Sequence, residues 1–473
     1  MFNFLSASRN RQKQKAVLSL EEAAHLLKTT PAALKAFEES YHLAEIRESE
    51  QSNNFFDLDS RTAAGMVAEQ PTEVLEEITT EMLQKADELA NRIVGELLTI
   101  SNRKNLPASD AELVSNTEIN TLPLQLRPEL TGTLCKRDIQ EDAYPAVLYN
   151  LKNAMHASNP KDYQLWLNRF KQGLDIMDID PVIYEILGCN QNSIGHWFPA
   201  LKEAVSRQSF FKIPETTIVK VPMPILQLTR LDYMSLHQST LDIVNRWAYE
   251  AFHLDENKTY FIKTGTYSSK FDFRNAKVTT PKEVRELGSY LLFIHHQAVA
   301  MAGPLVQPRP IVGVSTTNEW CVREYIEDQE NNPCIYHGMP LHTEYRVFID
   351  CDADEILGIT PYWKLDIMKN RFRKASNADE KHDFVIYSMH EKTLMERYHR
   401  NKDLVLEKVK VLLPALHLKG QWSLDIMQNG DDFWLIDMAL AANSALSDCV
   451  PKGKLKAVRE NWLPKLPIST EQD

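Results

Sequence analysis

Two aspartates near the C-terminal end stand inside otherwise apolar segments. Asp425 lies in WSLDIM and Asp437 in FWLID, and the Asn429–Gly430 dipeptide between them is a strong hairpin signal. A carboxylate in an apolar strand needs a partner, because burying it alone is costly. The two side chains share one face if the loop holds an odd number of residues, three or five, rather than two. Two converging carboxylates predict a Mg²⁺ site, and a pair of salt-bridged edge residues is the structural alternative.

Two lysines follow segments with the composition of β-strands. Lys220 lies in TTIVKVP and Lys263 in YFIKTG, and Lys263 opens a small, hydroxyl-rich loop that includes Ser268 and Ser269 and ends at Lys270. Backbone N–H groups, hydroxyls and lysines together suit a polyphosphate. The sequence contains neither GxxxxGK[ST] nor GxGxxG, and a lysine at a strand end taken alone is usually just solvated. These residues therefore indicate a phosphate site only in combination with the other segments of the same region.

Two further strand-like segments carry groups that suit a nucleotide. EWCVREYIED contains Glu324, Tyr325 and Ile326, which could lie along an adenine edge, while the later acid Glu330 could reach ribose hydroxyls. HTEYRVFID places Arg346 in the middle of a strand, where an arginine facing a cleft suits bidentate phosphate binding. The first of these segments, taken alone, is better explained as a plain amphipathic strand with a charged end.

The elements that must position these residues indicate an α+β domain over 209–455. Short β-rich segments alternate there with helical patterns over 281–302 and 394–416. The preceding region is mostly helical. Residues 131–208 have helical texture, and 71–100 form a long helix whose apolar residues recur at steps of three and four. This coiled-coil-like seam predicts either self-association or packing on a neighbouring helix.

The remaining segments are short modules and connections. Residues 1–45 combine a basic tail with a helix–turn–helix-like hairpin, 46–70 and 101–130 are linkers, and 456–473 form a tail. The second helix of the hairpin carries more acid than base, which does not favour contact with DNA phosphates. We therefore expect the hairpin to serve packing or contact with a partner.

The overall composition excludes several classes of protein. The formal charge of −12 argues against general binding to nucleic acid or membrane surfaces. The six cysteines are scattered without the spacing of a zinc site, which fits a reducing cytosol. No apolar run approaches the ~20 residues of a membrane span. We expect a cytoplasmic protein.

The order of these features resembles the ATP-grasp superfamily. A strand lysine, a second lysine with its loop, an adenine-edge strand, an arginine strand and an acid–hairpin–acid unit follow one another over about residues 210–450. The resemblance is to the branch that includes a eukaryotic cell-division-cycle protein with phage and bacterial relatives, and EYRVF with WSLDIM and FWLID carries most of it. It implies two α+β lobes that clamp Mg-ATP between them.

The resemblance also implies roles for individual residues. Those expected to touch the nucleotide are Lys220, Lys263, Ser268, Ser269, Lys270, Glu324, Tyr325, Ile326, Glu330 and Arg346, of which Lys263 and Arg346 would act in catalysis. Residues 264–270 match a loop that is mobile without nucleotide and folds over the phosphates. Asp425 and Asp437 match magnesium ligands. The family's third ligand, an asparagine, is replaced by Ala439, and Asn443 four residues later is the nearest substitute.

Three functions remain open on this evidence. The first is an ATP- and Mg²⁺-dependent ligase that joins a carboxylate, on a small molecule or on a protein or peptide, to an amine or other nucleophile through an acyl phosphate. Such an enzyme needs no nucleophilic side chain, in agreement with the absence of a Ser/His/Asp or Cys/His pattern. The alternative is an ATP-binding chaperone, scaffold or regulatory module without turnover, which Ala439 favours. The second alternative is nucleotide-dependent action on nucleic acid, which the acidic charge opposes.

Overall fold

The computed structural model describes residues 78–101, 116–130, 190–231, 233–302, 317–373 and 378–456, with a few isolated positions besides. Nearly all of them belong to one compact unit, which consists of Ile78–Gly132, Tyr184–Ala302 and Val312–Asp473. The predicted hairpin within 1–45, the linker 46–70, most of the helical region 131–208 and nearly all of the tail 456–473 lie outside the described residues.

A four-stranded antiparallel sheet holds the first lysines. Its strand order is β2-β5-β3-β4. The strands are β2 (Thr216–Lys220), β3 (Tyr260–Thr264), β4 (Lys277–Val278) and β5 (Glu319–Glu324). Successive side chains point to opposite faces, so Ile262 and Trp320 face the helices while Lys263 and Arg323 face the opposite way.

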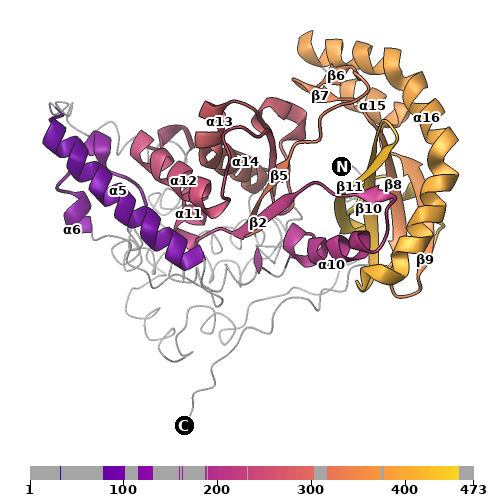
Figure 1. The fold of residues 1–473 in the computed structure, drawn as a ribbon, viewed down its shortest axis with the longest axis horizontal. Coiled ribbons are helices and arrows are strands. Elements are labelled where there is room, and N and C mark those ends of the chain that lie inside the picture. The colour runs from indigo at the N-terminus through magenta and orange to yellow at the C-terminus, as the bar shows by residue number, and fades with distance from the viewer. Residues whose placement is uncertain are drawn as a thin grey trace. The chain divides into compact units, whose positions relative to one another are not determined.

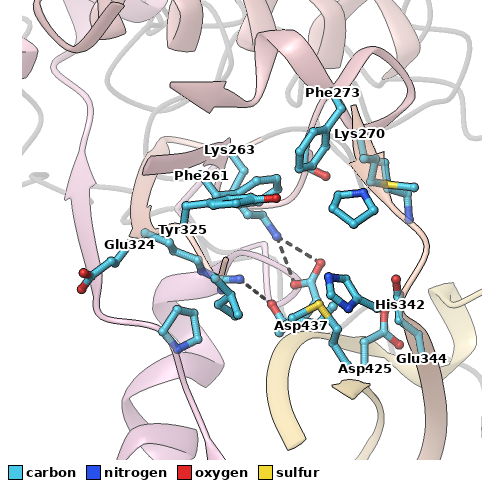
Figure 2. A pocket seen from close by; sticks show the side chains of 18 of the residues that line it. Phe261, Lys263, Lys270, Phe273, Glu324, Tyr325, His342, Glu344, Asp425 and Asp437 are labelled. Atoms are coloured by element: carbon cyan, nitrogen blue, oxygen red, sulfur yellow. Dashed lines mark hydrogen bonds and ion pairs between the residues drawn. The ribbon is translucent and has the colours of Figure 1, made fainter. Parts of the chain in front are cut away.

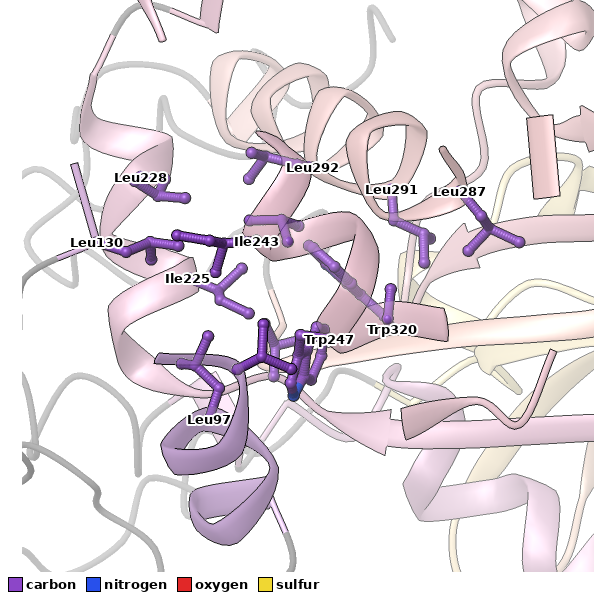
Figure 3. Close-up of a cluster of buried hydrophobic side chains, with 14 of the residues drawn as sticks. Leu97, Leu130, Ile225, Leu228, Ile243, Trp247, Leu287, Leu291, Leu292 and Trp320 are labelled. Atoms are coloured by element: carbon purple, nitrogen blue, oxygen red, sulfur yellow. The ribbon is translucent and has the colours of Figure 1, made fainter. Parts of the chain in front are cut away.

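Helices pack against the apolar face of this sheet and on one another (Figure 1). They are α5 (Thr80–Ser101), α6 (Asn116–Ile119), α11 (Met223–Gln227), α12 (Gln238–Ala251), α13 (Pro281–Arg285) and α14 (Leu287–Ala302). The start of α13 is fixed by a capping box between Thr280 and Glu283, with Pro281 at the first helical position. Figure 3 shows Trp247 of α12 beside Trp320 of β5 in the core that these helices and the sheet enclose.

Residues 116–130 join this core, although the sequence predicted a linker over 101–130. Ile119, Leu122 and Leu130 are buried there. The prolines of the segment indicated a loop, but the leucines and isoleucine between them pack inward. The apolar seam predicted for the 71–100 helix packs against another helix of the same chain, since α5 lies on α12 with Ile93 and Leu97 buried. Self-association through 71–100 stays a prediction.

A five-stranded sheet holds the arginine and the aspartates. Its order is β1-β11-β10-β8-β9, and only β1 and β11 run parallel. The strands are β1 (Phe211–Lys212), β8 (Thr343–Asp350), β9 (Glu355–Pro361), β10 (Gln421–Asn429) and β11 (Asp432–Leu440). The helices α10 (Ile194–Ser206) and α16 (Ala378–Leu416) pack on one face of this sheet (Figure 1). Because α10 belongs to this core, the domain begins before residue 209.

Smaller elements complete the unit around the second sheet. They are the ladder of β6 (Cys334–Ile335) with β7 (Met339–Pro340), the helix α15 (Leu365–Phe372) and short 3₁₀ helices that include η7 (Lys270–Asn275) and η8 (Ala441–Asn443). Helices with antiparallel and mixed sheets confirm the α+β fold class, with one sheet in each of two lobes. No helix among the described residues is long and apolar enough to cross a membrane.

The β10–β11 hairpin differs from expectation in its loop. Asn429 pairs with Asp432, so the turn contains only two residues, and Gly430 takes the positive φ of +64° that the turn requires. The predicted loop of three or five residues is therefore wrong. Asp425 nevertheless pairs directly with Asp437, because the register shifts by one residue between Asp425 and Ile426. Ile436 is the additional residue of this β-bulge, which brings the aspartates to one face.

Candidate functional site

A cavity lies between the two sheets, on the sides that carry Lys263 and Asp425 (Figure 2). The residues that line it are Pro214, Phe261, Lys263, Ser268, Lys270, Phe273, Arg323, Glu324, Tyr325, Ile326, Met339, Pro340, His342, Glu344, Trp363, Asp425, Met427, Ile436 and Asp437. Eight of the predicted site residues are in this set, brought together from segments up to 174 positions apart.

Three predicted residues form one row across neighbouring strands. Arg346 of β8 pairs with Asp425 of β10, and Asp425 pairs with Asp437 of β11. The guanidinium donates to both carboxylate oxygens of Asp425, from Nε at 2.7 Å and from Nη2 at 2.6 Å. Burial alone would lower the pKa of Arg346, but the Asp425 carboxylate raises it on balance. Arg346 itself lies behind Asp425, and Asp425 lines the cavity.

Lys263 crosses from the four-stranded sheet to the aspartate at the end of this row. Its side chain is 3% exposed, and Nζ lies 3.1 Å from each carboxylate oxygen of Asp437 (Figure 2). Asp437 is 42% exposed, toward the cavity that it lines. Burial alone would raise the pKa of the Asp437 carboxyl, but Lys263 and Arg323 lower it on balance. Lys263 is thus a buried cation at the cavity wall rather than a solvated strand end.

A second cluster of charges lies where β8 and the loop after β3 meet. Lys270 donates to the hydroxyl of Tyr362, and its Nζ lies 4.4 Å from the centre of that ring. The guanidinium of Arg346 lies 4.8 Å from the same ring. Burial alone would lower the pKa of Lys270, but Tyr362 and the carboxyl of Glu344 raise it on balance. Tyr362 therefore holds two cations near each other, one from each lobe.

Glu344 is a cavity residue that the sequence analysis did not select. It lies two positions before Arg346 on the same face of β8, and its Oε1 accepts a hydrogen bond from Trp363 Nε1 at 3.2 Å. Burial raises the pKa of its carboxyl to about 7 against the opposing effect of Lys270, and the nearby Asp425 carboxylate raises it further. A carboxyl that titrates near neutrality within a cavity is a common feature of functional sites.

Arg323 is the second important residue that was missed. It is 4% exposed and lies on the face of β5 that also carries Lys263 on the adjacent strand. Its Nη1 donates to the backbone carbonyl of Ile436, the additional residue in the β11 bulge. An arginine in the middle of the apolar segment EWCVREYI was a detectable signal, because the same reasoning selected Arg346. The partner across the cavity was not detectable from the sequence.

The other end of the cavity is apolar and aromatic. Phe261, Phe273 and Tyr325 lie close together (Figure 2). The ring centres of Phe261 and Phe273 are 5.9 Å apart, and those of Phe273 and Tyr325 are 6.3 Å apart. The ammonium of Lys277 lies 3.9 Å from the centre of the Tyr325 ring. The predicted segment Glu324 to Ile326 forms part of the wall here, and its place beside a nucleobase stays a prediction. Such a surface stacks well on a flat heterocycle.

The loop after β3 is packed rather than open. Thr264 and Ser269 are buried, and Thr264 Oγ1 accepts from the backbone N–H of Tyr267 at 2.9 Å. At Gly265 a side chain would clash with Ser193 Oγ, so the base of the loop is held against the start of α10. The mobility expected of 264–270 without nucleotide stays a prediction. Ser268 lines the cavity, and Ser269 does not.

Three other predicted residues lie outside the cavity lining. Lys220 is exposed at the end of β2. It lies on the same face of the sheet as Lys263, because their partners on β5 are Glu319 and Cys321, which point the same way. Glu330 forms an ion pair with Arg397 at 3.0 Å, which leaves it turned away from a ribose at the cavity. Asn443 accepts a hydrogen bond from Asn192 Nδ2 at 3.2 Å instead of joining the aspartates. Their proposed roles gain no support from these positions.

The aspartates can be compared with the needs of a magnesium ion. Among the described residues no group of three or more His, Cys, Asp and Glu side chains could hold a metal alone. Magnesium bound with a nucleotide does not need such a cage, since one or two carboxylates, phosphate oxygens and water complete its shell. Asp425 and Asp437 are partner residues on adjacent strands and supply the hard oxygen donors that it prefers. The donor set therefore fits Mg²⁺ with two protein ligands.

The comparisons with known proteins give only distant matches. No protein-family model and no curated protein matches the chain. Two structures of Cdc123 from Schizosaccharomyces pombe, one of them C-terminally truncated, align at 13% and 12% identity over 54% of this chain and 84% of theirs, each with a TM-score of 0.31. D-alanyl-alanine synthetase A from Vibrio cholerae O1 biovar eltor aligns at 11% identity over 59% of this chain and 62% of that one, with a TM-score of 0.22.

These scores are too low for the matches to bear on function. The alignments say only which solved structures this chain resembles in part, and no activity or partner follows from them.

Proposed function

We propose that this protein binds Mg-ATP in the cavity between its two sheets and uses it as an ATP-grasp ligase does. The observation that carries the proposal is the division of the cavity into an aromatic end and a charged end. The charged end gathers three cations, Lys263, Lys270 and Arg323, opposite the aspartates Asp425 and Asp437. A nucleoside polyphosphate has this same division between a flat apolar base and an anionic tail.

Each part of the nucleotide has a matching wall. The base would lie among Phe261, Phe273 and Tyr325. Among the described residues the backbone N–H of Ile326 has no hydrogen-bond partner, so it can donate to the base edge. The phosphates would meet Lys263 and Lys270, whose ammonium groups are point charges suited to this task. Asp425 and Asp437 would hold Mg²⁺, which neutralises phosphate charge when bound.

The proposed reaction couples a carboxylate to a nucleophile in two steps. An oxygen of the acceptor carboxylate attacks the γ-phosphorus, the bond from that phosphorus to the β–γ bridging oxygen breaks, and ADP leaves. An amine then attacks the acyl carbon, the bond to the phosphate oxygen breaks, and the amine loses a proton as phosphate leaves. Lys263 would stabilise the negative charge that develops around the transferred group, and Arg346 would contribute through Asp425, to which it donates two hydrogen bonds. The acceptor, a small molecule or a protein or peptide, is not specified by the cavity.

A second function, nucleotide binding without turnover, is favoured by two observations. Ala439 stands where the ATP-grasp resemblance implies an asparagine ligand, and Asn443 is bonded elsewhere. Each aspartate is also held by a protein cation, Asp425 by Arg346 and Asp437 by Lys263. A module that senses ATP and holds a protein partner would keep binding while losing catalysis. The free cysteines among the described residues fit a reducing compartment such as the cytosol for either function.

Calorimetric titration with Mg-ATP tests the proposal. The wild type should bind, and Asp425→Ala should weaken binding by about tenfold or more, since it removes a metal ligand. Asp431→Ala is the matched control, because Asp431 is an exposed acid in the turn of the same hairpin. Absence of wild-type binding would contradict the proposal. Release of ADP and phosphate in the presence of mixed acids and amines would favour the ligase, and binding without release would favour the second function.

A further inference from the structure

The bulge in β11 leaves one backbone carbonyl outside the regular strand pairing. Asp437 pairs with Asp425 and Leu435 pairs with Ile426, so Ile436 between them has no opposite residue on β10. A carbonyl that lies inside a protein without a donor is costly. Its donor comes from the other sheet, because Arg323 Nη1 on β5 donates to the Ile436 oxygen. The bulge is thus held from across the cavity.

Arg323 is well suited to fix that carbonyl in place. Its side chain is 4% exposed, and its guanidinium lies 5.9 Å from the centre of the Phe198 ring. A buried guanidinium without hydrogen bonds is unfavourable, so the contact with Ile436 stabilises both groups. Lys263 behaves differently, since it contacts the carboxylate oxygens of Asp437 directly. The two cations of this sheet therefore act on different atoms of the same short segment.

We propose that Arg323 is a positioning residue that holds the Ile436 carbonyl and thereby orients Asp437 beside Asp425 for a divalent cation. This inference rests on the proposed function of the cavity. The peptide that carries the Ile436 carbonyl leads directly into Asp437, so a rotation of that peptide displaces the Asp437 side chain. Without Arg323 the bulge can move its additional residue along β11, and the two aspartates lose their common face.

The measurement that isolates this role is the dependence of ATP binding on magnesium. For each variant the ATP dissociation constant is measured by calorimetry in Mg²⁺ and in EDTA, and the ratio of the two constants is the magnesium enhancement. Arg323→Met should reduce the enhancement about tenfold, because partners that orient metal ligands typically change metal affinity by about 10–100-fold. Arg323→Lys, which retains a long cationic donor, should restore most of it.

Two comparisons separate positioning from direct contact with phosphate. If Arg323 acts through Asp437, Arg323→Met should cause no further loss of enhancement in an Asp437→Ala background. Lys220→Met is the matched control, since Lys220 is an exposed cation on the neighbouring strand β2 and its removal should leave the enhancement unchanged. Should Arg323→Met fail to fold, Arg323→Gln, whose shorter amide does not span the cavity, should give the same loss.

The outcomes distinguish this inference from the function on which it rests. A normal enhancement in Arg323→Met and Arg323→Gln would overturn the inference while the nucleotide site stands. Equal weakening with and without magnesium would also overturn it, because that result identifies a direct phosphate ligand. Absence of ATP binding by the wild type would overturn both.

Discussion

The two walls of the cavity differ in the sign of their charge. The four-stranded sheet and the loop after β3 contribute cations, namely Lys263, Arg323 and Lys270. The five-stranded sheet contributes the acids Glu344, Asp425 and Asp437, together with Arg346 behind them. Both sheets alternate their faces in the usual way, and in each the face away from the cavity packs into an apolar core. The difference is confined to the sides that face each other.

This division of charge explains how the lobes hold together without a ligand. Lys263 reaches Asp437, and Arg323 reaches the Ile436 carbonyl, so these two cations of the first sheet find partners on the second. A metal-bound polyphosphate has both signs and can replace these contacts on each wall, with phosphate toward the lysines and cation toward the aspartates. Variants that remove charge from one wall should therefore affect different components of binding.

Removal of the buried lysine should have the largest effect. Lys263→Met should weaken ATP binding about 100-fold, since a hydrogen bond to a charged group contributes about 1.5–3 kcal/mol and about 1.4 kcal/mol is tenfold. Lys220→Met, at an exposed position on β2 on the other side of β5 in the same sheet, should change binding less than about twofold. Calorimetry on both variants measures the contrast. Equal losses would show that both lysines contact phosphate, contrary to their positions.

Neutralising the acidic wall should separate metal from phosphate. Asp437→Asn should weaken binding of Mg-ATP about tenfold, because a metal ligand is lost. Binding of ATP in EDTA should stay equal or become tighter, since Lys263 is released from its ion pair and a repelling charge is gone. Titrations with and without magnesium give both values. A matching loss in EDTA would mean that Asp437 serves to orient Lys263 rather than to bind a cation.

The carboxyl of Glu344 should make stability depend on pH. Burial raises its pKa from 4.5 to about 7 in the folded protein. Between these values the folded state binds a proton that the unfolded state has lost, so the unfolding free energy falls as the pH rises through this window. Glu344→Gln should remove about 1–2 kcal/mol of this fall between pH 5 and pH 8.

Denaturant unfolding at the two pH values measures the Glu344 effect. Glu324→Gln is the control, since Glu324 is 49% exposed at the edge of the same cavity. That variant should follow the wild type at both pH values. Parallel behaviour of Glu344→Gln and wild type would show that Glu344 stays ionised in the folded protein.

The smallest effect is expected at the aromatic end. Tyr325→Leu should weaken ATP binding about fivefold to tenfold, because an aromatic contact contributes about 0.5–1.5 kcal/mol beyond its area. Inorganic tripolyphosphate should bind both proteins equally, since it has no base to stack on the ring. Competition measurements with the two ligands test this. Equal weakening for tripolyphosphate would place the phosphates, rather than the base, beside Tyr325.

Much of the site could be predicted because strands impose a simple period. Arg346, Asp425 and Asp437 were each recognisable as a charged residue inside an apolar strand. Because side chains alternate along a strand, each was expected on the face opposite its apolar neighbours. The same signal was present at Arg323 and Glu344 but was not used. The α+β class followed equally from the mixture of strand and helix patterns.

The sequence by itself determined which residues carry the charges, and the tertiary structure decided which of them meet. Lys220 and Lys263 have the same local pattern, yet only Lys263 lines the cavity, because the sheet order and register place them differently. The alignment of Asp425 with Asp437 depends on a bulge that no turn signal revealed. Such contacts arise between segments far apart in the chain, and local propensity contains no information about them.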